Sequence, residues 1–193
     1  MTTLRRAFLS VGIFLAIMGP AKATVVNISA VTTGCTPCNG NPHPQVGDTL
    51  TSVISPVQLT LEPGTYTVAN GAGAPGANPD FTAWNFNSSG ANWVWAFLIV
   101  NDATLQVVMD GCCEQIYSTQ AAAATDPFAQ SFSQMFTLTQ QTTLDFVTED
   151  YDPGDNLGGV ALEIVPESSA ALSQMASIAG LVLLGRRRRP RTT

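Results

Sequence analysis

Four cysteines and a single histidine offer the widest choice of chemistry in this sequence. Cys35 and Cys38 have the C-x-x-C spacing of redox sites, in which the first cysteine lies at a helix N-terminus. The residues that follow, "NGNPHP", contain two prolines and therefore argue against a helix at this point. A zinc site is a second interpretation, because the chain could draw four ligands from Cys35, Cys38, His43, Cys112 and Cys113.

The N-terminal segment indicates the compartment in which these cysteines act. Arg5 and Arg6 precede a short apolar run, and the small residues Ala21 and Ala23 follow it. This order of charge, apolar core and small residues is typical of a secretory signal peptide, here residues 1–23. We therefore expect signal peptidase to cleave after Ala23 and the mature chain to begin at the next residue.

Secretion favours disulfide bonds as the third interpretation of the cysteines. An oxidising compartment and an even number of cysteines both predict pairing, with three connectivities open. Adjacent Cys112 and Cys113 are poor partners for each other, because the ring that they would close is strained. We expect bonds from the loop of Cys35 and Cys38 to the turn of Cys112 and Cys113, with a Cys35–Cys38 bond as the alternative.

A dense acidic segment, "EDYDPGDN", is the next candidate site. Its residues carry the hard oxygen atoms that Ca²⁺ prefers: Glu149, Asp150, Asp152, Asp155 and Asn156. The spacing is not that of an EF-hand, because Leu157 occupies the position that requires glycine when the loop starts at Asp152. A calcium site in a loop between strands is one interpretation, and an acidic turn bent by Pro153 and Gly154 is the other.

Motifs for nucleotide binding and for hydrolysis are incomplete. "GAGAPG" at residues 71–76 has the G-x-G-x-x-G spacing, but Pro75 lies inside it and no helix is expected after it, so we expect a loop. His43 lies between two prolines, and the sequence contains no G-x-S-x-G motif. We therefore predict no catalytic residue. Hydrolysis of glycosides by paired carboxylates stays an alternative, because acidic residues are numerous.

The charges are distributed very unevenly along the chain. All eight basic residues lie in the two end segments, whereas the fourteen acidic residues run from Asp48 to Glu167. The segment from Thr24 to Glu167 thus contains no Lys or Arg. Such a segment repels nucleic acids and anionic lipids and attracts cations or basic partners. Nucleic acid is therefore not an expected partner.

The elements that must position these residues are β-strands. Runs rich in Val, Ile, Thr and aromatic residues alternate with Gly, Pro, Asn and Asp. They predict strands at 25–31, 49–54, 57–61, 66–68, 93–100, 105–109, 133–138, 142–148 and 160–165. Within the mature segment only "STQAAAATDPFAQS" has helical propensity, and Pro127 interrupts it. We expect one all-β domain at residues 24–165, an antiparallel β-sandwich or jelly roll.

Tryptophans are the best candidates for contacts with a sugar. Trp93, Trp95 and Phe97 alternate along a predicted strand whose other face is also apolar, which indicates a central strand buried on both sides. Trp84 lies instead in the irregular segment "FTAWNFNSSG". We expect it at the surface, as a candidate sugar contact.

The C-terminal segment, residues 166–193, has the features of a segment that halts translocation through a membrane for a time. Its apolar stretch supports a helix of about 22 Å, which is shorter than the roughly 30 Å hydrocarbon core of a bilayer. The cluster Arg186, Arg187, Arg188 and Arg189 follows directly and stops translocation. We therefore expect a short apolar C-terminal helix that contacts a membrane transiently.

Three parts of this segment resemble the sorting domain of PEP-CTERM proteins of Gram-negative bacteria. They are the tripeptide Val165, Pro166 and Glu167, the apolar "AGLVLLG" and the cluster "RRRR"; Ser168 stands where the class has proline. The run "DNLGGVALEIVPE" is also similar to the closing strands of many cargo domains in that class. The resemblance implies export, transient contact with the inner membrane through the tail, and removal of the tail by an exosortase. It further implies an association with exopolysaccharide in a biofilm or floc matrix.

These observations predict a non-enzymatic secreted protein of the cell surface or extracellular matrix, mature from about Thr24 to Glu167. A carbohydrate-binding module is the first alternative; it would use Trp84 and, with Ca²⁺, the acidic segment. An extracellular glycoside hydrolase is the second. The fold class alone does not discriminate among these three functions.

Overall fold

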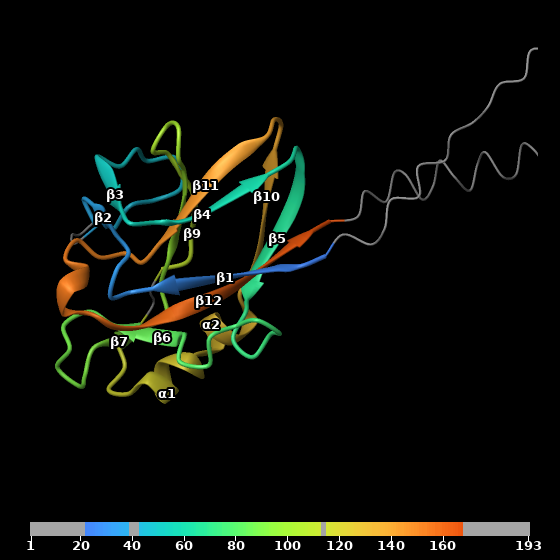
Figure 1. Ribbon diagram of the computed structural model, residues 1–193. Coiled ribbons are helices and arrows are strands. Elements are labelled where there is room, and N and C mark those ends of the chain that lie inside the picture. Colours follow the sequence, from blue (N-terminus) through green and yellow to red (C-terminus); the bar gives the residue numbers. More distant parts are fainter. Residues whose placement is uncertain (1–21, 39–42, 113–114, 168–193) are drawn as a thin grey trace, which may run out of the picture.

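The structure, a computed structural model, describes residues 22–38, 43–112 and 115–167. These residues form two antiparallel sheets that face each other across an apolar core (Figure 1). The first sheet contains β1 (Thr24–Ser29), β5 (Gly64–Asn70), β6 (Thr82–Asn85), β7 (Trp93–Val94), β10 (Ser133–Leu138) and β12 (Leu157–Pro166). The second contains β4 (Val57–Leu61), β8 (Leu98–Asn101), β9 (Val107–Asp110) and β11 (Thr142–Val147). The expected antiparallel all-β class is confirmed.

The last strand, β12, organises the first sheet by using both of its edges. One edge pairs with β1, from Thr24 opposite Ile164 to Ser29 opposite Gly159. The other edge pairs with β6 near its start and with β5 near its end. β5 and β6 therefore lie end to end along β12, and the chain leaves the sheet between them. The "GAGAPG" segment lies in this excursion, which is a series of turns, as expected.

The two glycines near the start of β12 are required by their surroundings. Gly158 has a φ of +79°, which favours glycine. A Cβ atom on Gly159 would overlap the carbonyl oxygen of Ile28 and would lie 2.8 Å from the ring of Phe81. β1 therefore approaches β12 this closely only because residue 159 has no side chain.

We expect Gly159→Ala to destabilise the domain by about 1–3 kcal/mol, because the added methyl group forces β1 or the Phe81 ring to move. Gly64→Ala is the matched control, since its Cβ would meet Tyr66 at 3.6 Å, an ordinary contact. The measurement is urea unfolding of both variants. Equal stability of the two variants would show that the β1–β12 approach is looser than described.

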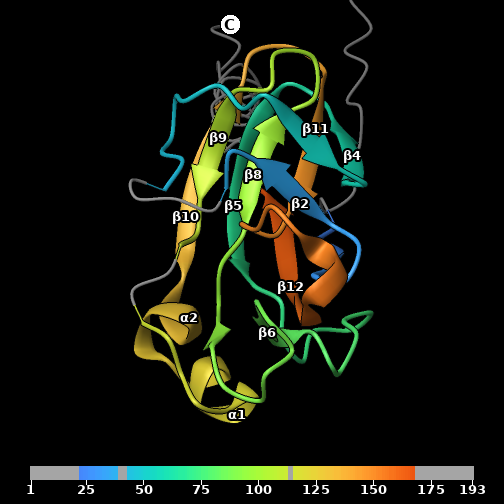
Figure 2. The ribbon, with the colours of Figure 1, turned by 90° about the vertical axis from the view of Figure 1, so that its left-hand side faces the viewer.

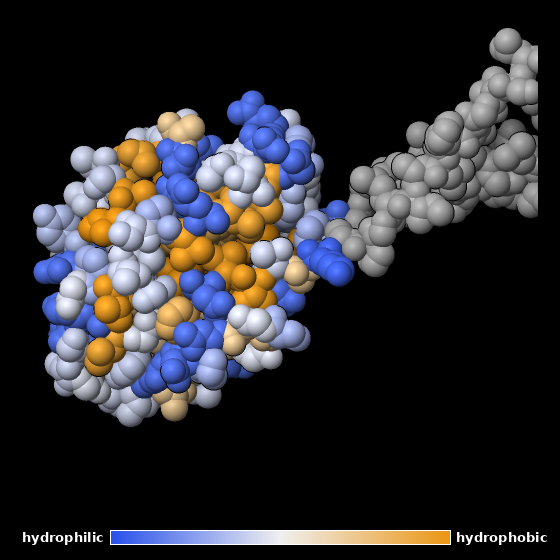
Figure 3. Space-filling view, in the orientation of Figure 1, coloured by the Kyte–Doolittle hydropathy of each residue, from blue (hydrophilic) through white to orange (hydrophobic). Residues whose placement is uncertain are grey.

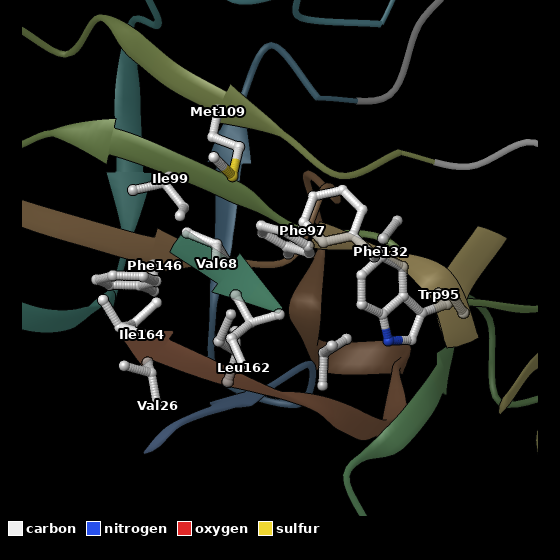
Figure 4. Packing of buried hydrophobic residues seen from close by; sticks show 14 of the residues in the cluster. Val26, Val68, Trp95, Phe97, Ile99, Met109, Phe132, Phe146, Leu162 and Ile164 are labelled. Atoms are coloured by element: carbon white, nitrogen blue, oxygen red, sulfur yellow. The ribbon is translucent and has the colours of Figure 1, made fainter. Parts of the chain in front are cut away.

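The main core lies between the two sheets and is rich in aromatic rings. Figure 4 shows Trp95, Phe97 and Phe132 packed together at one end of the core. The ring centroids of Trp95 and Phe132 lie 5.1 Å apart, and those of Phe97 and Phe132 lie 5.3 Å apart. Phe146 and Ile164 fill the other end. Such ring pairs add to the stabilisation that burial of their apolar area provides.

The second sheet is buried on its outer face as well. Ile99 points into the main core, whereas Leu98 and Val100 contact a second apolar cluster on the opposite face. This cluster is covered by residues from the segment around β2 (Gly34–Thr36) and β3 (Ser52–Ile54). The predicted burial of both faces is thus confirmed for β8.

Two short helices close one end of the sheets (Figure 2). The side chain of Thr119 accepts a hydrogen bond from the backbone of Ala122 and caps α1 (Gln120–Ala124). Asp126 caps α2 (Pro127–Ser131) in the same way, and Pro127 occupies its first turn. Pro127 therefore begins a second helix, because a proline needs no intrahelical donor at that position. No helix among the described residues is long and apolar enough to cross a membrane.

The surface is not uniformly polar. Figure 3 shows apolar side chains at the centre of the face on which β1 and β4 lie. β1 and β4 are edge strands of their respective sheets and contact each other. The apolar residues of β4 (Val57, Leu59 and Leu61) are half-buried and pack against the main core. Part of the core therefore reaches the surface between the two edges.

Most predicted strands are present, but two strands were missed and several predicted bounds differ from the observed ones. The strands predicted at 57–61 and 133–138 have the bounds of β4 and β10. The strand predicted at 93–100 is divided into β7 and β8, since residues 95–97 pair with no neighbour as strand. β2 and β6 were not predicted, because both are short and lie among glycine, asparagine and proline.

Candidate functional site

The cysteines pair differently from the expectation. Cys35 and Cys38 form a disulfide bond with a Cα–Cα distance of 5.4 Å. Both pack in the outer cluster against the second sheet, whereas Cys112 contacts the main core on the other side of that sheet. The predicted bonds between the two regions are therefore wrong, and the Cys35–Cys38 alternative is confirmed. Cys112 is disulfide-bonded too, and Cys113 lies outside the described residues.

This disulfide bond also rules out Cys35 and Cys38 as the predicted zinc ligands. A zinc-binding cysteine is a thiolate, and the sulfur atoms of Cys35 and Cys38 are bonded to each other. The histidine of that predicted set has a different neighbour. His43 Nδ1 lies 2.8 Å from Oε1 of Glu149, which sequence reasoning had placed in the calcium set.

Glu149 is positioned by the chain on either side of it. The backbone N–H of Thr148 donates to Oγ1 of Thr33, and the Thr148 hydroxyl donates to the carbonyl of Thr33. On the other side, the N–H of Cys35 donates to the carbonyl of Asp150. The segment around Glu149 is therefore held against residues 33–35, just beyond the end of β11. Its side chain is only 1 % exposed, whereas that of His43 is 48 % exposed.

A third group, Asp110, joins the pair from the end of β9. Its Oδ1 accepts a hydrogen bond of 2.8 Å from the N–H of Cys112. Its Oδ2 accepts one of 3.4 Å from Nε2 of Gln45, which also donates to the carbonyl of His43. Gln45 thus connects the backbone at His43 to the Asp110 carboxyl group.

Burial and mutual charge change the acidity of this site. Burial, and secondarily the charge of Asp110, raises the pKa of Glu149 to about 8. Burial also raises the pKa of Asp110, an effect that the hydrogen bond from Cys112 and the proximity of His43 reduce. No Lys or Arg between Thr24 and Glu167 can compensate these carboxylates. The charge can be balanced by protons, by His43 or by a bound cation.

The predicted calcium ligands do not converge. The Asp152 side chain accepts a hydrogen bond from the N–H of Gly154 and caps the 3₁₀ turn Pro153–Asp155. The Asn156 side chain donates to the carbonyl of Ala30, and Asp150 Oδ1 accepts from the N–H of Tyr151. Within the described ranges, one group of three His, Cys, Asp or Glu residues brings its ligand atoms within 4.8 Å of one another. It consists of His43, Cys112 and Glu149, and Asp155 is not in it.

Trp84 is not at the surface, contrary to the expectation. It lies on β6 in the main core with 1 % exposure, and its Nε1 donates to the carbonyl of Ala96 over 2.9 Å. The error has a local cause: the polar segment around Trp84 hides the pairing of β6 with β12. Trp84 is therefore unavailable to a sugar in this structure.

Sequence reasoning missed Asp110 altogether. Nothing near Asp110 in the sequence marks it, because its partners come from a loop 65 residues earlier and from the end of β11. The one usable signal was global. The domain has fourteen acidic residues and no Lys or Arg. A buried carboxyl group in it therefore cannot form an ion pair with a Lys or Arg side chain.

The residues predicted for sorting fall at the end of the fold. Val165 and Pro166 pair with Thr67 and Tyr66 of β5. Glu167 continues this contact, since its N–H donates to the carbonyl of Thr65. Ala23 is exposed directly before β1. Ala21, Arg186–Arg189 and most of both predicted end segments lie outside the described residues.

Comparison of the chain with protein-family models, with curated proteins and with solved structures gave no match.

Proposed function

We propose that the chain is a secreted, non-enzymatic protein of the cell surface or extracellular matrix, released from a leader and from a PEP-CTERM-like sorting tail. The observation that supports this is the position of the two proposed cleavage sites relative to the strands. β1 begins at Thr24, directly after the proposed signal-peptidase site. β12 ends at Pro166, where the tripeptide of the sorting motif ends the sheet. Cleavage at both sites would leave every described strand intact.

The two proposed cleavage sites are also close in space. Thr24 pairs with Ile164 in the ladder of β1 and β12. Both end segments would therefore leave the domain at the same end of one sheet, as Figure 1 shows for the start of β1 and the end of β12. Such an arrangement suits a domain that is tethered to a membrane during export and then released. The Cys35–Cys38 disulfide suits an oxidising compartment.

The two alternatives receive less support. The carbohydrate-binding module rested on Trp84, which is buried. A glycoside hydrolase needs a carboxylic acid with a raised pKa that reaches the sugar, and Glu149, whose pKa is raised to about 8, has a side chain that is 1 % exposed. A structural role in the matrix requires neither group.

Intact-mass and peptide mass spectrometry of the protein released by a Gram-negative host that carries an exosortase tests the proposal. We expect a mature chain that starts at Thr24, ends close to Glu167 and contains the Cys35–Cys38 bond. Replacing Arg186–Arg189 by glutamine should leave the tail attached. Ser168→Pro, which completes the motif of the class, should increase the processed fraction. Released protein that still carries residues 186–191 would contradict the proposal.

A further inference from the structure

We infer that the apolar part of the tail, residues 171–185, docks onto the seam between β1 and β4 while the tail is attached and no membrane is present. The seam is the surface between β1, an edge strand of the first sheet, and β4, an edge strand of the second. Docking goes beyond the proposed function, because it requires neither an exosortase nor removal of the tail. The occupant lies outside the described residues, whereas the seam lies within them.

The seam is apolar, and its two edges lack the usual protection. Val57, Leu59 and Leu61 are half-buried and pack against the main core. Edge strands of natural proteins usually carry Lys, other charges or Pro, which prevent association with another chain. β1 ("TVVNIS") and β4 ("VQLTL") contain none of these residues. Figure 3 shows the apolar side chains at the centre of this face. A contiguous apolar area of this kind is typical of an interaction surface.

The apolar part of the tail has the pattern of a helix that lies on a surface. Residues that share one face of such a helix are Leu172, Met175, Ala176, Ala179 and Leu183. Its polar residues share the opposite face: Ser173, Gln174 and Ser177. Leu181 and Leu184, near the end, lie outside the apolar face. A helix of this kind can cover an apolar surface with one face and keep the other in water.

The length and the starting point of the tail fit the seam. Thr24, the first residue of β1, pairs with Ile164, so the tail leaves the domain where β1 begins. β1 contains six residues and spans about 20 Å. A helix of residues 171–185 is about 22 Å long. After a reversal at residues 168–170, this helix would therefore run beside β1 to the far end of the seam.

The charges of the tail and of the domain are complementary at that far end. Ala30 follows β1, and its carbonyl accepts a hydrogen bond from the side chain of Asn156 in the acidic segment. Figure 1 shows this segment as an orange turn beside the end of β1, far from the end of β12. Asp152 and Asp155 are exposed there. Arg186–Arg189 follow the apolar part of the tail directly and would reach these two carboxylates.

The tail is a better occupant than a second copy of the domain. Only three residues, 168–170, separate its apolar part from the end of the fold. The effective concentration of a segment on so short a linker is about millimolar. Two copies of the domain would repel each other, since each has fourteen acidic residues and no Lys or Arg. Docking would thus cover the apolar part of the tail until the chain meets a membrane, and loss of the tail would expose the seam.

Site-specific photo-cross-linking of the full chain tests the docking. The chain is purified with its tail, in detergent-free buffer, from a host that lacks an exosortase. A benzophenone amino acid replaces Met175, on the apolar face, in one sample and Ser177, on the polar face, in the other. We expect the probe at Met175 to cross-link within the monomer to peptides that contain Thr24–Ser29 or Val57–Leu61. The probe at Ser177 is the matched control and should give little of this product, because it points away from the seam.

A charge variant tests the contact of the arginines. Asp152→Asn combined with Asp155→Asn should lower the yield of the Met175 cross-link about two- to tenfold, as expected for the loss of exposed ion pairs. Asp48→Asn combined with Asp80→Asn removes the same charge from two other exposed residues and should leave the yield unchanged. Circular dichroism shows whether each variant is folded.

Four results would overturn the proposal. They are the absence of a cross-link to β1 or β4, equal yields from the two probes, cross-linked dimers in place of cross-linked monomers, and recovery of the tail-bearing chain with membranes alone. None of these results depends on where the mature chain ends, so a failure of docking is distinguishable from a failure of the proposed sorting.

Discussion

Lowering the pH from 8 to 5 is expected to stabilise the metal-free domain, and Glu149→Gln should remove most of that gain. Burial raises the pKa of the Glu149 carboxyl to about 8 in the folded protein, from an ordinary value of 4.5. Between these two values the folded state binds one proton more than the unfolded state. The free energy of unfolding therefore falls as the pH rises, by at most about 1.4 kcal/mol per pH unit. The total change from pH 5 to pH 8 is about 3–4 kcal/mol.

The other carboxyl groups with raised pKa values do not reverse this trend. Burial raises the pKa values of Asp110 and, on the second sheet, Asp145, so both act in the same direction at lower pH. His43 is the partner on the exposed side. In the Glu149→Gln variant the free energy of unfolding should consequently depend only weakly on pH in the acidic range. It should no longer change between about pH 6 and pH 8.

Urea unfolding at several pH values in the presence of EDTA measures this effect. EDTA is needed because a bound cation would take the place of the proton on Glu149. Glu62→Gln, at an exposed glutamate, is the matched control and should reproduce the pH dependence of the unchanged chain. A stability that is constant or rising between pH 5 and pH 8 would show that Glu149 is not protonated in the folded state.

Trp84→Ala is expected to reduce the free energy of unfolding by about 3–5 kcal/mol, the usual cost of removing a buried tryptophan. The ring is fully enclosed in the main core, and its N–H donates to the carbonyl of Ala96. Trp84→Phe should cost less, because it keeps much of the apolar volume and loses chiefly the hydrogen bond.

Tyr151→Ala is the control for Trp84, since it also truncates an aromatic residue, but one that is 54 % exposed. It should change the stability by about 0.5 kcal/mol or less. The two variants also separate a structural from a sugar-binding role for Trp84. Unchanged stability of Trp84→Ala together with loss of saturable glycan binding would return Trp84 to the surface and revive the carbohydrate-binding function.

The candidate site shows where local patterns stop being informative. His43 and Glu149 were each recognised as carriers of chemistry, but in different sets: one with cysteines for zinc, the other with acidic neighbours for calcium. Their pairing depends on His43 lying beside the residues that follow β11, and no spacing in the chain encodes that contact. Asp110 joins them only because β9 ends beside the same loop.

Hydrophobic patterning in the sequence alone determined the antiparallel all-β class, most of the strands and the two-sided burial of β8. These features follow from local alternation of apolar and polar residues, which acts over a few residues. The uneven charge also follows from the sequence, and it predicts an affinity for cations. Only the tertiary structure decided the Cys35–Cys38 bond, the burial of Trp84 and the meeting of His43 with Glu149. Each of these depends on which distant segments are brought into contact, and that is decided by the packing of the whole domain.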